Sequence, residues 1–75
     1  MKLYAMTYQF GSTVVVERYE SEDQMNKVIR WAKSSGYAVH DLIQVESDYN
    51  QPRVEVHNLD SNTVKYFDEV GNHLL

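Results

Sequence analysis

Residues 21–37 read SEDQMNKVIRWAKSSGY and contain the start, interior and end signals of one helix. Ser21 is a favoured N-cap residue, and Gln24 follows three positions later, as a capping box requires. Four apolar residues follow at the i, i+3, i+4, i+7 spacing of a single helix face: Met25, Val28, Ile29 and Ala32. The sequence therefore predicts an amphipathic helix from Ser21 to Ser35.

The end of this helix has its own signal. Gly36 can adopt the left-handed conformation that follows many helices, because it has no Cβ. Tyr37 comes next and can pack back on Ala32, as in a Schellman ending. We expect the helix to stop here and a strand to begin.

The chain before the helix is predicted to form a β-hairpin. Residues 2–10 alternate, Gly11-Ser12 suits a two-residue type II′ turn, and residues 13–20 are rich in β-branched side chains. This turn predicts the cross-strand pairs Phe10–Thr13, Tyr8–Val15, Met6–Glu17 and Tyr4–Tyr19. One face then carries large side chains, namely Tyr4, Met6, Tyr8, Phe10, Val15 and Tyr19. The other face carries Leu3, Ala5, Val14 and Val16, followed by Arg18 and Glu20.

Three further strands are predicted after the helix. They cover residues 37–46, 53–59 and 63–67, and residues 73–75 form either a short strand or a frayed end. In the first of them, Val39, Ile43 and Val45 share a face, and the polar residues 47–52 form a loop. The predicted fold is a single α+β domain, residues 1–75, in the order β-β-α-β-β-β. One helix packs on a mainly antiparallel sheet of four or five strands.

A single helix can cover only one side of this sheet, although the hairpin has apolar residues on both sides. A domain of 75 residues without cysteine has a small core and no disulfide to support it. We therefore expect the uncovered face or a sheet edge to bind a partner protein or a second copy in a homodimer. The residues predicted to contribute are Leu3, Ala5, Val14, Val16, Arg18, Lys27, Arg30 and Trp31.

Charge and composition favour a cytoplasmic protein-binding module over other classes. No apolar stretch is long enough for a membrane span, so no membrane association is expected. The net charge of −4 disfavours nucleic acid, which binds cationic surfaces. Nucleic-acid binding stays the alternative, because sheet aromatics can stack bases beside a basic helix ridge. Those residues are Tyr4, Tyr8, Phe10 and Tyr19 on the strands and Lys27, Arg30 and Lys33 on the helix.

The aromatic residues have a simpler interpretation as the core beneath the helix. Trp31 lies between the apolar stripe and the basic ridge, so it can either close over the core or form a binding hot spot. The sequence leaves these two roles open.

No catalytic or cofactor motif is recognisable. The histidines, His40, His57 and His73, are too widely spaced to form a local metal-binding pair. There is no cysteine nucleophile, no G-x-S-x-G and no glycine-rich phosphate loop. We expect a protein that is not an enzyme and that needs no metal or cofactor, a small regulator or inhibitor.

Residues 3–46 are predicted to form a hairpin, then a helix that begins with acidic residues and ends at Gly36-Tyr37, and then a strand. This order of elements resembles that of small phage-encoded proteins that bind and inhibit host enzymes. HicB-type antitoxins have a similar pattern. The resemblance implies an inhibitory protein-binding role and assigns no functional residue.

Overall fold

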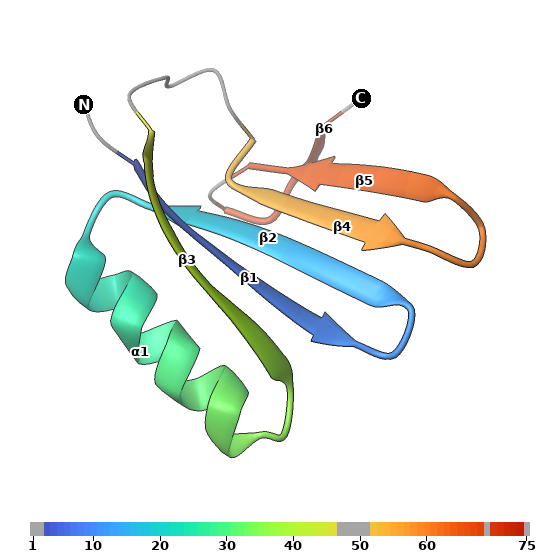
Figure 1. Cartoon of the computed structure of the whole chain (residues 1–75). Coiled ribbons are helices and arrows are strands. Elements are labelled where there is room, and N and C mark those ends of the chain that lie inside the picture. Colours follow the sequence, from blue (N-terminus) through green and yellow to red (C-terminus); the bar gives the residue numbers. More distant parts are fainter. Residues whose placement is uncertain (1–2, 47–51, 69, 75) are drawn as a thin grey trace.

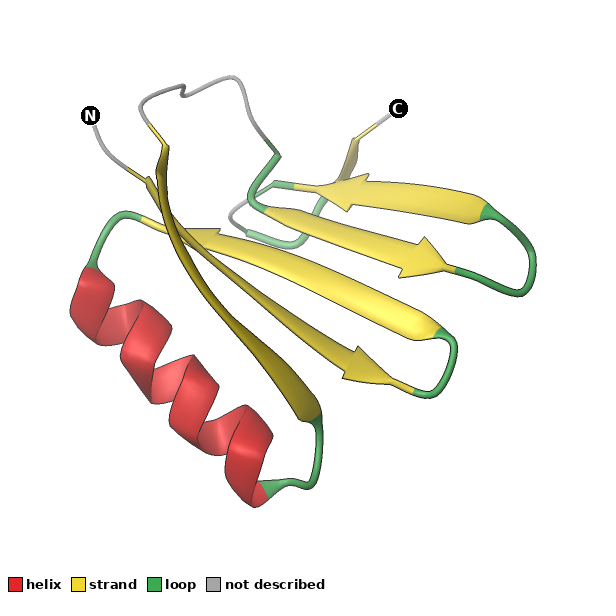
Figure 2. Cartoon of the chain, in the orientation of Figure 1, coloured by secondary structure: helices red, strands yellow, loops and turns green. Residues whose placement is uncertain are grey.

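One helix lies against one face of a six-stranded antiparallel sheet in the computed structural model (Figure 1, Figure 2). The structure describes residues 3–46, 52–68 and 70–74, with the side chains of residues 41–46 outside this description. The elements are β1 (Leu3–Phe10), β2 (Thr13–Tyr19), α1 (Glu22–Ser34), β3 (Ala38–Glu46), β4 (Val54–Asn58), β5 (Thr63–Phe67) and β6 (His73–Leu74).

The predicted α+β class and the single helix on an antiparallel sheet are confirmed. The predicted strand number is wrong, because the sheet has six strands in the order β3-β1-β2-β4-β5-β6. The additional strand is the two-residue β6, which pairs with β5 through Tyr66 and Phe67. His73 and Leu74 therefore form the short strand that the sequence allowed as one of two alternatives, and residue 75 lies outside the described residues.

The helix has the predicted extent between its two caps, Ser21 and Ser35, but it lacks the predicted capping box. Ser21 is the N-cap residue, yet its side chain makes no capping hydrogen bond, so the capping box does not form. At the other end, the N–H of Gly36 donates to the carbonyl of Lys33 (3.2 Å) and the N–H of Tyr37 to that of Ala32 (3.0 Å). With Gly36 at φ +86°, these two bonds are the predicted Schellman ending.

The first hairpin has the predicted register. Phe10 pairs with Thr13, and the remaining pairs follow along β1 and β2 as expected. Gly11 has φ +58°, the positive value that a tight hairpin turn needs at its first position. A two-residue turn fixes the register, and with it the face on which every side chain of the hairpin lies.

The later strands agree with the sequence except at their ends. β3 begins one residue after the predicted start at Tyr37, and its pairing with β1 shifts between Ala5 and Thr7. β4 is shorter at both ends than the predicted 53–59, whereas β5 matches. The predicted loop 47–52 lies outside the described residues except for Pro52. The prediction that Ile43 and Val45 share a face stays untested, because their side chains lie outside the described part of the structure.

The helix covers the large-residue face of the hairpin. The Trp31 ring meets the Tyr8 ring edge-on, with 6.1 Å between the ring centroids, which places α1 on the Tyr8 side of the sheet. Met6 is on the same face and is buried together with Met25 and Ala32 of the helix. Among the described residues, α1 contacts β1, β2 and β3 and none of the other three strands. Figure 1 shows the β4–β5 hairpin extending beyond the helix.

Candidate functional site

The face of the sheet opposite the helix carries an apolar surface over β5 and β6. Val64 and Tyr66 of β5 and Leu74 of β6 are 40–41% exposed. The register joins them into one surface, because Leu74 pairs with Tyr66 and Val64 lies on the same face two residues away. Half-buried Val14 and Val16 of β2 continue this surface on the other side of β4.

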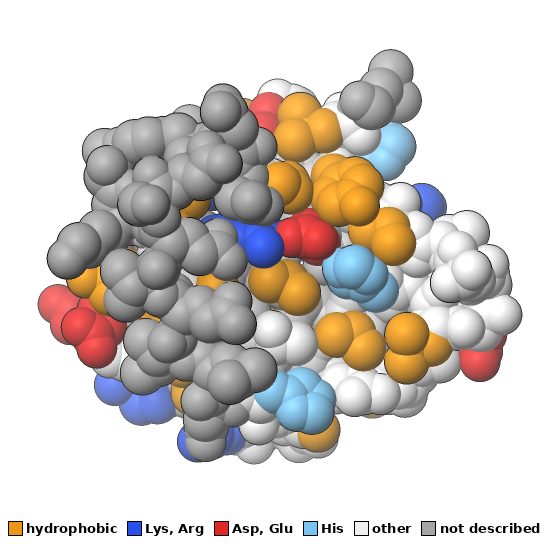
Figure 3. Space-filling view, turned by 45° about the horizontal axis from the view of Figure 1, so that its top comes forward, with side chains coloured by type: hydrophobic (Ala, Val, Ile, Leu, Met, Phe, Trp, Pro, Cys, Tyr) orange, Lys and Arg blue, Asp and Glu red, His pale blue; other side chains and the backbone are white. Residues whose placement is uncertain are grey.

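A row of charged and polar side chains crosses the middle of the same face. Arg18 of β2 forms an ion pair with Glu55 of β4, and only 10% and 14% of their side-chain surfaces are exposed. The Arg18 guanidinium also donates to the carbonyl oxygen of Pro52 (3.0 Å). Nε2 of His57 lies 3.3 Å from the second carboxylate oxygen of Glu55. Figure 3 shows a basic, an acidic and a histidine side chain side by side, surrounded by hydrophobic ones.

The sheet residues predicted to bind a partner are placed unequally. Leu3 and Ala5 lie on the face opposite the helix but are only 0% and 4% exposed, so they offer a partner almost no surface. Val14 and Val16 stay half-buried beside the Arg18–Glu55 pair. The exposed apolar area of this face therefore lies over β5 and β6, away from the first hairpin.

The helix residues predicted to bind a partner form a separate surface. Trp31 is 51% exposed and still contacts Tyr8, so it both closes the core and faces solvent. The ring of Tyr37 bridges Trp31 and Phe10, with 5.4 Å between centroids in each pair. Lys27 and Arg30, predicted with Trp31, are exposed on the helix, as is Lys33. The structure does not bring these residues together with Val14, Val16 and Arg18.

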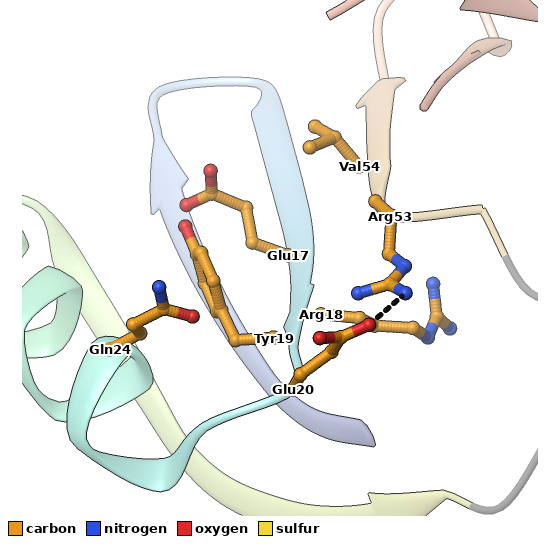
Figure 4. Close-up of a pocket in the computed structure, with 7 residues that line it drawn as sticks. All are labelled: Glu17, Arg18, Tyr19, Glu20, Gln24, Arg53 and Val54. Carbon is orange, nitrogen blue, oxygen red and sulfur yellow. Dashed lines mark hydrogen bonds and ion pairs between the residues drawn. The ribbon is translucent and has the colours of Figure 1, made fainter. Parts of the chain in front are cut away.

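A pocket of about 400 Å³ lies on the helix side of the sheet, where β2 leads into α1. Figure 4 shows the Glu17 carboxylate beside the Tyr19 hydroxyl, with the Gln24 amide approaching from the helix. An ion pair between Glu20 and Arg53 (3.0 Å) forms part of the rim. The remaining lining residues are Arg18 and Val54.

Burial controls the ionisation of the groups in this pocket. Desolvation raises the pKa of Glu17, while hydrogen bonds from the hydroxyls of Tyr19 and Tyr8 lower it and offset part of the rise. Desolvation, followed by the nearby Glu17 charge, also raises the pKa of Tyr8 to about 12 and that of Tyr19 further. Both phenols therefore stay protonated at neutral pH and act as donors to Glu17.

Sequence reasoning did not identify Glu17, Glu55 or the β5–β6 surface. Glu17 had a usable signal, since the predicted register already placed it opposite Met6 on the core face. The histidines lie apart: His57 contacts Glu55, Nε2 of His40 lies 3.4 Å from the Gln9 amide oxygen, and the His73 ring contacts the Phe67 ring at a tilted angle. Within the described ranges, no group of three or more potential metal ligands comes together.

The comparisons with known proteins identify no relative. No protein-family model, no curated protein and no solved structure matches this chain. As for membranes, α1 is too short and too polar to cross a bilayer, and the described part of the chain contains no other helix.

Proposed function

We propose that this protein is a non-catalytic protein-interaction module, a small regulator or inhibitor that binds through the helix-free face of its sheet. The supporting observation is the apolar surface of Val64, Tyr66 and Leu74, about two fifths exposed and continuous across β5 and β6. Clustered apolar side chains on the surface of a small protein are typical of docking sites.

The neighbouring charges fit this role. The Arg18–Glu55 pair is shielded at the centre of the face, and His57 lies between it and the exposed Val64. Protein interfaces commonly combine an apolar surface with a few oriented polar groups that select the partner. We infer that the apolar residues supply affinity and the charged row supplies selectivity.

A variant pair on one strand tests the proposal. Val64→Lys places a charge on the helix-free face, whereas Thr63→Lys places the same charge one residue away on the opposite face. Both native residues are exposed, so neither substitution fills the core. We expect binding to be lost with Val64→Lys and kept with Thr63→Lys.

Sedimentation velocity over a micromolar concentration range identifies the partner as self or non-self. Concentration-dependent dimers of the wild type that disappear only in Val64→Lys indicate a second copy. If the wild type is a monomer, the same two variants are used as bait in affinity capture. A specific partner protein must then bind Thr63→Lys and fail to bind Val64→Lys. The proposal fails when the two variants behave alike in both measurements.

Nucleic-acid binding is the second candidate, supported by exposed Trp31 beside Lys27 and Arg30 on the helix. The arrangement of the tyrosines speaks against it, because Tyr8 is on the face that α1 covers and offers no open stacking platform. A salt titration of single-stranded DNA and RNA binding separates the candidates, since counterion release gives a steep salt dependence.

A further inference from the structure

The pocket between β2, α1 and β4 contains a carboxylate in an unusual setting. Glu17 lies on the core side of β2, where its register neighbours are Met6 and Val54, both apolar. Its partners are neutral donors, the hydroxyls of Tyr8 and Tyr19. Within the described residues, the interactions that set its pKa include no cation. When Glu17 is ionised, its partly buried negative charge is therefore stabilised by the dipoles of two hydroxyl groups and not by an ion pair of its own within the described residues.

We propose that this pocket binds an organic cation, a guanidinium or alkylammonium group, against the carboxylate of Glu17. A volume of about 400 Å³ is within the range of small-molecule sites. The ring of Tyr19 and the side chain of Val54 offer apolar contact to the aliphatic stem of such a ligand (Figure 4). Tyrosine rings also attract cations through their faces.

Charge complementarity favours a cation over an anion. An anion would meet the Glu17 carboxylate at the wall, whereas the guanidinium groups at the rim already have acidic partners, Arg53 with Glu20 and Arg18 with Glu55. A bound cation offsets the free-energy cost of keeping Glu17 ionised away from water, because a nearby opposite charge favours the charged form of a carboxyl group. A guanidinium also brings five N–H donors for the carboxylate and the nearby Gln24 amide oxygen.

This inference is independent of the proposed docking function. The pocket opens on the helix side of the sheet, whereas Val64 and Tyr66 are on the other face. A failure of the Val64→Lys experiment therefore leaves cation binding intact, and a failure of cation binding leaves protein docking intact.

Cation binding should weaken in acid. The groups facing Glu17 are Tyr8 from β1, Tyr19 from β2, uncharged Gln24 from α1, and the Glu20–Arg53 pair with Arg18 at the rim. The phenols are protonated at neutral pH, because their pKa values are raised, and a lower pH does not change their charge. Glu17 takes up a proton as the pH falls through its raised pKa, which removes the charge that attracts the ligand.

Titration of the full chain with matched probes, followed by two-dimensional NMR, tests the proposal. Nα-acetyl-arginine amide carries a guanidinium, and Nα-acetyl-citrulline amide replaces it with a neutral urea of nearly the same shape. We expect saturable shifts at Tyr19, Gln24 and Val54 with the first probe and at least tenfold weaker binding of the second. Agmatine serves as a free polyamine probe. If the blocked arginine binds more tightly, the natural ligand is assigned to an arginine side chain of a protein. If agmatine binds more tightly, the natural ligand is assigned to a free polyamine.

Glu17→Gln should weaken the arginine probe at least tenfold, whereas Asp60→Asn, the same chemical change in the β4–β5 turn, should leave it unchanged. Equal binding of arginine and citrulline probes to the wild type overturns the proposal. So does unchanged binding in a folded Glu17→Gln variant. If that variant does not fold, the wild type at mildly acidic pH decides: retained affinity after protonation of Glu17 overturns the proposal.

Discussion

Arg18 and Glu55 form an ion pair across β2 and β4, on the face of the sheet that the helix leaves uncovered. The pair is largely shielded from water, and the Arg18 guanidinium also holds the carbonyl oxygen of Pro52 just before β4. This contact connects the first hairpin to the second at the point where the helix no longer covers the sheet.

Removal of one partner of this pair should be costly. Arg18→Met leaves Glu55 partly buried, with His57 as its remaining partner among the described residues, and we expect a loss of roughly 2–3 kcal/mol in the free energy of unfolding. The double variant Arg18→Met/Glu55→Gln should lose less than the two single changes together, as measured by urea denaturation. Lys65→Met, an exposed cation on β5, is the control and should change stability by less than about 0.5 kcal/mol. Strict additivity would show that the pair is not coupled.

Glu17 should make the protein less stable at neutral pH than in mild acid. Its pKa is raised in the folded state, so the native protein holds this proton more strongly than the unfolded chain. The contribution of Glu17 to stability therefore increases as the pH falls from neutral through this raised pKa. Glu17→Gln should raise the free energy of unfolding at neutral pH and flatten its pH dependence, whereas Asp60→Asn should preserve the wild-type curve. An unaltered pH dependence in Glu17→Gln contradicts this account.

Asp68 should have the opposite pH dependence. Its carboxylate accepts hydrogen bonds from the backbone N–H groups of Asn72 (2.8 Å) and Val70 (3.0 Å), which lower its pKa. The stabilisation it provides is present above the unfolded pKa and is lost as the pH falls through the lowered folded value. Asp68→Ala should speed amide hydrogen exchange at Asn72 and in β6, while Asp68→Asn, which keeps an acceptor oxygen, should do so less. Equal exchange rates in the two variants would show that the acceptor oxygen of Asp68 does not stabilise β6.

Met25 should be indispensable for folding. It is fully buried on the sheet-facing side of α1, and truncation of a buried methionine to alanine costs about 2–5 kcal/mol. Domains of this size rarely have more than about 3–5 kcal/mol of net stability. Met25→Ala should therefore be largely unfolded by circular dichroism, whereas Lys27→Ala on the exposed side of α1 should remain folded. A cooperative thermal transition of Met25→Ala near that of the wild type would be the contrary result.

The parts of the fold that were predicted correctly have short-range causes. Gly36 and Tyr37 end the helix through bonds to residues within the same two turns, and Gly11 fixes the register of the first hairpin. Such signals lie within a few neighbouring residues, so a single sequence contains them. The Ser21 capping box was wrong, because a favourable residue pattern does not guarantee the side-chain bond.

The candidate site depended on contacts between residues far apart in the chain. Arg18 and Glu55 meet only because β4 pairs with β2, and Leu3 is buried although α1 is on the opposite face. Alternation in the sequence sorts residues into two faces, but it does not specify which strands become neighbours. Glu17 is the exception: the hairpin register alone placed its acidic side chain on the apolar face.

The position of β1 has a practical consequence for handling the protein. β1 is the first strand in the chain, and it pairs on both sides, with β3 and with β2 (Figure 1). β6, the last strand, lies at the outer border of the sheet. A fusion or affinity tag joined ahead of residue 3 therefore meets a strand held between two others, whereas one joined after residue 74 meets only a peripheral ribbon. Attachment at the carboxyl end therefore disturbs the fold less, but Leu74 of β6 belongs to the proposed docking surface, so binding has to be measured with such a tag removed.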